Sequence, residues 1–360
     1  MASIDKIFGD VRSILEERPS REGWEALCGH LDQCSEDALE QEVVPYCLDK
    51  LKRWPSELRV LPKQWAIDAV CHEDDSPKYR IATTLGFLCG STRASWALKG
   101  ADGGDKLARF LGEHGGIERL ELKGHPLGSL GIRQLCLAPE LQRVTYLDLR
   151  YTQLGDPGAK HLAACPHLGA VKTLRLRRAK IKSSGGAAFA KAKSLANLEH
   201  LGLGYNNFGK RSWANIAKSN LLAEDITYLD MGYNNAGLDA IKTVLTPERA
   251  ASLKCLNLRA CDIDREDFLR ETAGLEFGNL EMLNLENSTN WATKASVMLE
   301  YAAFPKLRYL YMNEPEIDLE GVTTSEAFVE RFRVKNPEFI EFVDYYAEEG
   351  EFPGNFWVRD

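Results

Sequence analysis

Cysteine and histidine side chains gather in two short stretches of the chain, where they could bind a metal ion. They are Cys28, His30 and Cys34 near the start, and His161, Cys165 and His167 further along. Zinc in proteins usually takes four ligands, supplied as two closely spaced pairs. Neither stretch supplies four ligands, and buried cysteines are common in ordinary cores. We therefore predict no metal site and no cofactor.

The residues that could support nucleotide or acyl chemistry are also incomplete. The segment Gly204–Lys210 lies between a predicted strand and a predicted helix, but Arg211 stands where a phosphate-binding loop needs a hydroxyl for magnesium. The chain has no G-x-S-x-G motif, and its last histidine is His200. We therefore predict that the protein is not an enzyme.

An apolar pattern repeats through the middle of the chain. Apolar residues occupy the first, fourth and sixth positions of eight segments that start 27 or 28 residues apart. The segments start at Ile117, Val144, Val171, Leu198, Ile226, Leu253, Leu280 and Leu307. The second half of each segment alternates as a strand does. A helix-like stretch follows, with Asp156–Pro157 and Asp264 as candidate helix starts.

Each strand and helix of this repeat is too short to bury its apolar face alone, so the copies must stack on one another. The pattern LxxLxLxx(N/C)xL resembles the leucine-rich repeat family, and its length is most similar to the ribonuclease-inhibitor-like class. Asn206, Asn234 and Cys261 match the ninth position, where His125 could also form hydrogen bonds. The resemblance implies an α/β solenoid with a curved parallel β-sheet on the concave side and helices on the convex side.

Three regions follow from this pattern: residues 1–116, the repeats at 117–317, and residues 318–360. Apolar residues at helical spacing predict an all-α region over 1–116, including a helix through Ile81, Leu85 and Leu88. This region is either a cap for the first repeat or a separate adaptor, since Leu61–Pro62 and Trp96 faintly resemble the F-box module of ubiquitin-ligase adaptors. Residues 318–360 predict an acidic, aromatic-rich helical cap that includes a helix after Asn336–Pro337.

The outward positions of the predicted strands carry tyrosine and arginine, which are frequent at binding hot spots. We expect these side chains to be exposed on the concave face and to bind a partner. The candidate binding residues are Tyr146, Arg150, Tyr151, Arg175, Arg177, Arg178, His200, Tyr205, Tyr228, Asp230, Tyr233, Asn257, Arg259, Tyr309 and Tyr311. The alternative is a solvent-exposed face whose aromatic residues only favour strands.

The charge distribution indicates the kind of partner. The net charge is −8, yet residues 117–317 carry 26 basic and 22 acidic side chains. No acid occurs between Asp156 and Glu199, a stretch with nine basic residues. We predict an acidic protein partner, because the pI of 5.6 argues against nucleic acid. Since exposed charges contribute little to folding, reversing Arg175 and Arg177 should remove binding and leave the melting temperature unchanged.

These observations predict a non-catalytic protein–protein interaction scaffold that binds its partner on the concave face. The alternative is a two-partner adaptor or regulator, in which the N-terminal helices recruit one protein and the repeats another. No apolar run is long enough to cross a membrane, and the first residues lack a secretory signal. Nine cysteines without a CxxC pair indicate reduced thiols. We therefore expect a cytoplasmic protein with no membrane contact and no small-molecule ligand.

Overall fold

The computed structural model describes residues 4–55, 58–59, 62–71, 76–83, 86–89, 98–114, 116–286, 293–312, 315–320, 322 and 324–342. The chain forms two compact units, Met1–His200 with Ser219–Leu222, and Leu201–Lys218 with Ala223–Asp360. Within the described ranges, every helix is too short or too polar to cross a bilayer. Leu61 and Trp96 lie outside these ranges, so the faint F-box resemblance stays untested.

The first unit begins with helices that bury their own apolar core. They are α1 (Ile4–Glu16), α2 (Arg21–Leu31), α3 (Glu36–Ala38), the π-helical η1 (Leu39–Val43), α4 (Val44–Leu51), α5 (Lys63–Ala66), the π-helical η3 (Ile67–Cys71) and α6 (Lys78–Thr83). Ser20 caps α2 by accepting a hydrogen bond from the Gly23 N–H. The buried Trp65 donates to Asp32 at 2.7 Å, which joins the later helices to α2.

A strand follows these helices where the sequence predicted a helix. The helix α6 ends at Thr83, and β1 (Gly86–Cys89) pairs in parallel with β2 (Ile117–Glu121). The prediction of an all-α region over 1–116 was therefore wrong at β1, because a single strand has no second copy to reveal its period. The helix α7 (Gly100–Glu113) then packs against α8 (Gly128–Leu135) through Gly104 and Gly131, where a Cβ on Gly104 would overlap the Gly131 carbonyl.

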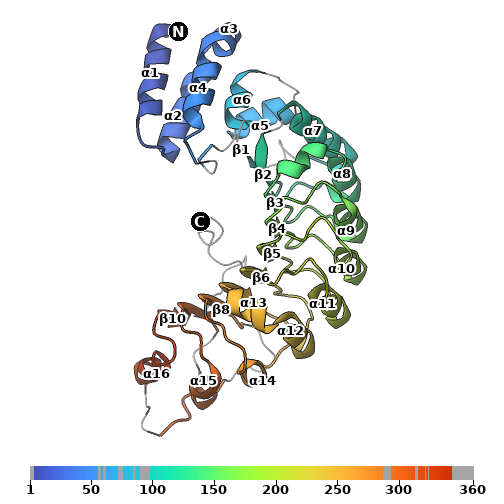
Figure 1. Ribbon diagram of the computed structural model, residues 1–360, viewed down its shortest axis with the longest axis vertical. Helices are drawn as coiled ribbons and strands as arrows, with labels where there is room; N and C mark the ends of the chain where they lie inside the picture. The colour runs from blue at the N-terminus through green and yellow to red at the C-terminus, as the bar shows by residue number, and fades with distance from the viewer. Residues whose placement is uncertain are drawn as a thin grey trace. The chain divides into compact units, whose positions relative to one another are not determined.

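The repeats of the first unit place strands on one side and helices on the other (Figure 1). The strand β2 pairs with β3 (Tyr146–Asp148), which pairs with β4 (Thr173–Arg175), all in parallel. The helices α8, α9 (Gly155–Ala164) and α10 (Ser183–Phe189) alternate with them, and a 3₁₀ turn, η5 (Pro139–Arg143), precedes β3. Leu120, Leu147 and Leu174 are register partners and fully buried, so the predicted apolar positions form the core.

The second unit repeats this arrangement. Its strands β6 (Tyr228–Asp230), β7 (Cys255–Asn257), β8 (Met282–Asn284), β9 (Tyr309–Tyr311) and β10 (Glu341–Phe342) pair in parallel in chain order. Its helices are α11 (Lys210–Ala217), α12 (Leu238–Val244), α13 (Pro247–Ser252), α14 (Arg265–Thr272), α15 (Ala295–Tyr301) and α16 (Ser325–Phe332). The strand β5 (His200–Gly202) lies where the two units divide.

The C-terminal region combines a helix with a strand. The helix α16 agrees with the predicted cap, but the helix predicted after Asn336–Pro337 is wrong, because β10 pairs with β9 there. Asn336 instead accepts a hydrogen bond from the Phe304 N–H at 2.8 Å and joins the last repeat to the cap. The predicted cap residues from 343 onward lie outside the described residues.

The two candidate helix starts behave differently. Asp264 accepts hydrogen bonds from the N–H groups of Glu266 and Asp267, so it caps α14 as predicted. Asp156 does not cap its own helix. Its carboxylate accepts from the N–H groups of Lys182 and Gly185, at the start of α10 in the next repeat. A capping residue can therefore join two copies of the repeat.

Candidate functional site

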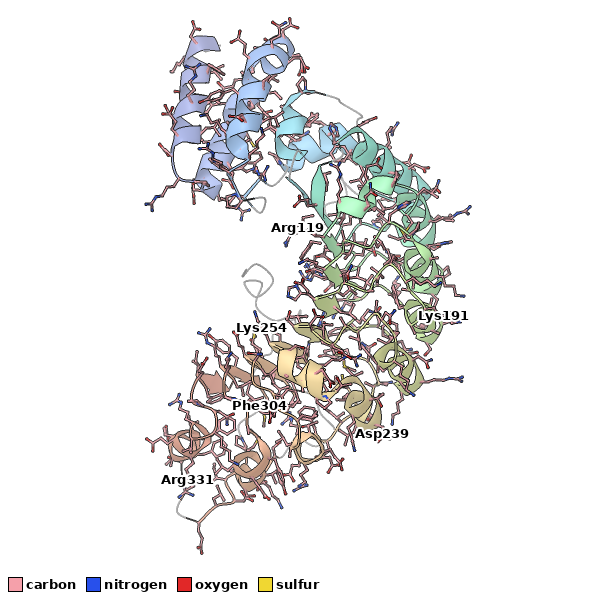
Figure 2. All side chains as sticks on the ribbon, viewed as in Figure 1. Arg119, Lys191, Asp239, Lys254, Phe304 and Arg331 are labelled. Atoms are coloured by element: carbon pink, nitrogen blue, oxygen red, sulfur yellow. The ribbon has the colours of Figure 1, made fainter. Side chains whose placement is uncertain are left out.

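The sheet face of the first unit is built around the carboxylate of Asp148. Arg150 donates to it from Nε at 2.9 Å and from Nη2 at 2.6 Å, and Arg175 Nη1 lies 3.6 Å from Oδ2. Arg175 also donates to the Tyr146 hydroxyl at 3.1 Å. Burial is the main cause that raises the pKa of Tyr146, so this hydroxyl stays protonated. Arg119 stacks on the ring of Tyr146 at 3.4 Å, and Figure 2 shows Arg119 on the strand side of this unit.

These side chains are buried, contrary to the expectation of an exposed face. Asp148 is 0 % exposed, Arg175 6 % and Arg177 2 %, and Tyr146 and Arg150 are buried as well. Adjacent strands lie about 4.8 Å apart, so long side chains in neighbouring strands cover one another. The expectation that Arg175 and Arg177 are exposed was therefore wrong, and reversing their charges is now expected to lower stability, since buried charges need their partners.

The sheet face of the second unit is also largely internal. Tyr228, Cys255, Met282 and Tyr311 form a buried apolar cluster, against which the half-buried Tyr309 packs. Neighbouring strands supply these residues, so each side chain excludes water from the next. We therefore assign Tyr228 and Tyr311 a packing role, and among these candidates only Tyr309 keeps exposed surface.

The polar candidates of the second unit hold the ends of the strands. Asp230 accepts a hydrogen bond from the Gly232 N–H at 2.9 Å, and Asn257 accepts one from the Arg259 N–H at 3.0 Å. Arg259 is buried and lies 3.3 Å from the Glu286 carboxylate. Each amide or carboxylate thus satisfies a backbone group where its strand ends. The expectation that Asp230 and Asn257 are exposed was wrong, because both side chains turn inward to bond these backbone groups.

The turns that follow the strands expose four bulky side chains. Tyr151, Arg178, Tyr205 and Tyr233 are half-buried, and all four adopt left-handed backbone with φ between 52° and 61°. We call Tyr151 and Arg178 the exit ridge of the first unit, and Tyr205 and Tyr233 the exit ridge of the second unit. A residue other than glycine costs about 1 kcal/mol or more in this conformation. Glycine or asparagine would form the turn more easily, and Ala260 in the equivalent position of the next repeat has the same backbone with φ 50°, so the turn does not require large side chains.

The turn itself is held by backbone and amide groups. The Tyr205 N–H donates to the Gly232 carbonyl at 2.8 Å, and the Tyr233 N–H donates to the Arg259 carbonyl at 2.7 Å. The buried amide of Asn234 donates to the carbonyls of Leu203 and Met231, both at 3.0 Å. Because these groups define the backbone, the two tyrosine rings are not needed to form the turn.

The exit ridge presents rings and cations together in each unit. In the first unit, Arg178 and Lys123 each lie 5.6 Å from the ring of Tyr151. In the second, the rings of Tyr205 and Tyr233 stack with centroids 3.6 Å apart, and Arg259 lies 5.3 Å from the Tyr233 ring. His200, also a candidate, shares a 2.9 Å hydrogen bond with Thr173 and is half-buried.

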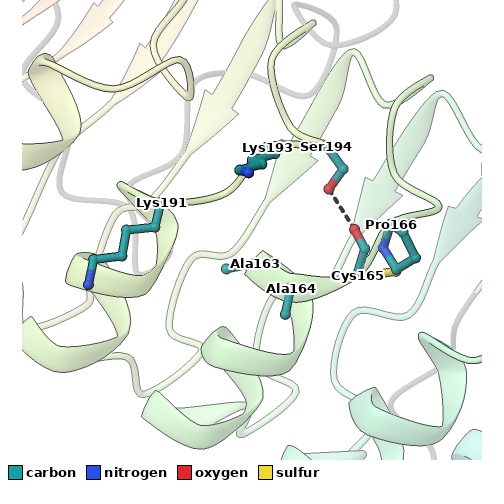
Figure 3. A pocket seen from close by; sticks show the side chains of 7 residues that line it. All are labelled: Ala163, Ala164, Cys165, Pro166, Lys191, Lys193 and Ser194. Atoms are coloured by element: carbon teal, nitrogen blue, oxygen red, sulfur yellow. Dashed lines mark hydrogen bonds between the residues drawn. The ribbon is translucent and has the colours of Figure 1, made fainter.

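The residues considered for phosphate binding have structural roles in the repeat. The N–H of Phe208, in the glycine-rich segment, donates to the Asn234 side chain at 3.1 Å, and its ring is buried. Among the described residues, no group of three potential metal ligands comes together. A hollow of about 450 Å³ lies beside Cys165, Lys191 and Lys193, where Ser194 donates to the Cys165 carbonyl at 2.6 Å (Figure 3).

Comparison with known proteins agrees with this architecture. A family model described as "Leucine Rich repeat" matches residues 142–163. The structure of yeast Rad7 in complex with Elc1 aligns with a TM-score of 0.54 at 12% identity, covering 88% of this chain and 78% of that chain. The chain has the fold of a leucine-rich-repeat solenoid. An internalin from Listeria monocytogenes aligns with a TM-score of 0.39 at 16% identity, covering 76% of this chain and 78% of the internalin chain. No curated protein matches.

The leucine-rich-repeat solenoid is an interaction fold, because each added repeat extends a surface instead of enclosing a cavity. Sequence reasoning found the tyrosines and Arg178 of the exit ridge through their place in the repeat. It missed the organising role of Asp148 and the contributions of Arg119 and Lys123. Asp148 and Arg175 occupy the same position in successive repeats. Their opposite charges in neighbouring strands could have indicated from the sequence that they pair.

Proposed function

We propose that this protein is a non-catalytic scaffold that binds another protein through the exit ridge of each unit. The observation that carries the proposal is the set of four bulky side chains held in left-handed backbone, half-exposed and stacked with cations. Backbone strain of this kind is retained where the side chain it presents is useful. Tyrosine offers a large rigid face with one polar tip, which suits a protein partner.

The partner that fits this ridge is acidic and carries apolar anchors. In the first unit, Arg178 and Lys123 flank Tyr151, and no acid occurs between Asp156 and Glu199. In the second unit the stacked tyrosines supply apolar surface, while Arg259 is balanced by Glu286. Arginine binds carboxylates with paired hydrogen bonds. We propose that the exit ridge of the first unit binds acidic groups and that the exit ridge of the second unit binds apolar groups.

We also propose that the protein works in a cytoplasmic, reducing environment. The seven cysteines whose side chains the structure describes are all free thiols, and all of these but Cys34 are buried. Burial raises the pKa of the Cys47 thiol to about 12, so this side chain remains an unreactive part of the core.

The binding proposal is tested with substitutions that preserve the turn. Asparagine adopts left-handed backbone readily, so Tyr205→Asn with Tyr233→Asn removes both rings without a clash. Proteins that bind the wild-type chain should no longer bind this variant or the Arg178→Glu variant. They should be retained by Lys160→Glu, an exposed change of equal charge on α9.

The captured partner is then purified and its binding measured across a salt series. Arg178→Glu should slow association in a salt-dependent way, and the tyrosine variant should mainly speed dissociation. The ridge proposal is wrong if the captured proteins are the same for all variants. The acidic-protein proposal is wrong if a nucleic-acid duplex binds tightly at physiological salt and no acidic protein does.

A second candidate function is a two-partner adaptor, in which the N-terminal helices recruit one protein and the repeats another. The observation that favours it is the number of apolar residues that these helices bury among themselves, including Trp24, Leu27, Val43 and Cys47 of α2 to α4. A cap needs only to cover β2 and α8, the first strand and helix of the repeats. The strand β1 pairs with β2 and α7 packs on α8, so these two elements already cover them.

A further inference from the structure

Two N-terminal helices present a matched pair of aromatic and basic side chains. On α1, Phe8 and Arg12 lie four residues apart, and on α4, Tyr46 and Lys50 do the same. Residues at this spacing lie on one face of a helix, about 6 Å apart along its axis. The rings of Phe8 and Tyr46 meet with centroids 5.4 Å apart and planes tilted by 59°. We call these four residues the N-terminal patch.

The two cations of the patch lie over its rings. Arg12 lies 4.5 Å from the centroid of Phe8 and 5.6 Å from that of Tyr46, so it bridges both helices. Lys50 lies 5.6 Å from the Tyr46 centroid. A ring face attracts a cation and displaces part of its water. The rings therefore hold both charges in place, which lowers the entropy cost of meeting a carboxylate.

The patch lies outside the core of these helices. Ile7 and Val11 of α1, with Val44 and Cys47 of α4, are buried and account for the packing of the two helices. Phe8 and Tyr46 are only half-buried, and Arg12 is exposed. The rings therefore leave apolar surface in contact with water beyond what the helix packing requires.

Neither cation of the patch is neutralised within the described part of the chain. Lys52 pairs with Asp49 at 3.3 Å and Arg21 pairs with Glu25 at 3.4 Å, but no carboxylate forms an ion pair with Arg12 or Lys50. This is unusual in a region with an excess of acids, where twenty acidic and fifteen basic residues fall within 1–116. The patch therefore offers two positive charges beside two apolar rings. A partner surface with carboxylates beside apolar side chains is complementary to it.

We propose that the N-terminal patch docks an acidic amphipathic helix of a partner protein. The apolar face of that helix lies on Phe8 and Tyr46, and carboxylates one turn apart meet Arg12 and Lys50. Asp5 on α1 and Glu42 on η1, which leads directly into α4, stand one turn before the two rings, and they favour basic residues towards one end of the partner helix. This surface is separate from the exit ridge, so the inference does not depend on the proposed ridge function.

The test uses a displayed library of random 16-residue peptides selected on the full-length chain. The patch variant carries Arg12→Glu and Lys50→Glu, and the control variant carries Lys6→Glu and Arg53→Glu, which are exposed and change the charge equally. Thermal unfolding of all proteins establishes that the variants are folded. A second pair of changes, Arg12→Gln with Lys50→Gln, removes the charges without adding repulsion.

We expect selected peptides that bind the wild-type chain and the control equally and the patch variant at least about tenfold more weakly, with an intermediate loss for the glutamine pair. These peptides should be rich in acids and carry apolar residues at helical spacing. The proposal is overturned if no peptide is selected, if every peptide binds the patch variant as well as wild type, or if the peptides lost are not acidic. The Tyr205→Asn, Tyr233→Asn protein should keep these peptides, which separates this result from a failure of the ridge proposal.

Discussion

The rings of Tyr205 and Tyr233 stack with centroids 3.6 Å apart and planes 22° apart, although both residues adopt left-handed backbone. The left-handed turn directs each side chain out of its strand, so residues from neighbouring repeats meet face to face. Stacking contributes about 0.5–1.5 kcal/mol beyond the buried area. This gain is similar to the backbone cost of one of the two residues, so stacking offsets only part of the strain of the pair.

This balance leads to a prediction about stability. Tyr205→Asn with Tyr233→Asn should change the free energy of unfolding by less than about 1 kcal/mol, because lost stacking is offset by relieved strain. Tyr233→Val should destabilise by about 2 kcal/mol, because a β-branched residue is strongly disfavoured at positive φ. Urea unfolding of both variants gives the comparison. Equal stability of the asparagine and valine variants would contradict the strain argument.

The buried carboxylate of Asp148 gives a second prediction. Asp148→Asn should lower the stability by about 3 kcal/mol or more, because Arg150 and Arg175 would stay buried without their negative partner. Arg175→Glu with Arg177→Glu should be at least as damaging. The matched control is Glu121→Gln, which breaks the partly exposed pair with Arg119 and should cost less than about 1 kcal/mol. If the two single variants unfold at the same urea concentration, the pairing around Asp148 is not stabilising.

The contact between α7 and α8 gives a third prediction with a control on the same helix. Gly104→Ala should destabilise by about 2 kcal/mol or more, because the added methyl group would overlap the Gly131 carbonyl. Gly112→Ala should be neutral or should stabilise by about 0.5 kcal/mol, since nothing lies within 4 Å of its Cβ position. Thermal unfolding measures both. A stable Gly104→Ala protein would mean that α7 is not tightly packed on the first repeat.

The histidine at the ninth position of the first repeat predicts a pH dependence. His125 is fully buried and its Nδ1 accepts a hydrogen bond from the Leu98 N–H at 3.0 Å. Burial lowers the pKa of His125 from 6.5 to about 4, so the unfolded chain binds more protons than the folded chain between these values. Stability from this group is therefore complete above about pH 6.5 and is lost as the pH falls towards 4.

The measurement compares urea unfolding at pH 7.5 and pH 5. The wild-type chain should lose about 2 kcal/mol from this group, and His125→Asn should lose less, because asparagine does not titrate and still offers an acceptor. An identical pH dependence in the two proteins would show that His125 titrates normally.

The repeated part of the fold could be predicted from the sequence because burial imposes the same demand on each copy. Leu147 and Leu174 face one core from neighbouring strands, so their spacing is repeated along the chain and is visible without a structure. The exit-ridge tyrosines could be located for the same reason, since their position is counted from the leucines. By contrast, the repeat spacing does not extend to β1 and β10. Each of them is a single strand that pairs with a terminal repeat strand, β1 with β2 and β10 with β9.

Only the tertiary structure decided which outward side chains reach water. Asp148 and Arg175 occupy equivalent positions in successive repeats, and nothing in either repeat alone shows that they pair and become buried. Asp156 likewise looks like the cap of its own helix but caps the helix of the next repeat. The leucine spacing is visible in the sequence because every repeat must bury its own apolar residues. Exposure and charge pairing depend on which side chains stand next to each other across the sheet, and those neighbours meet only when the repeats stack.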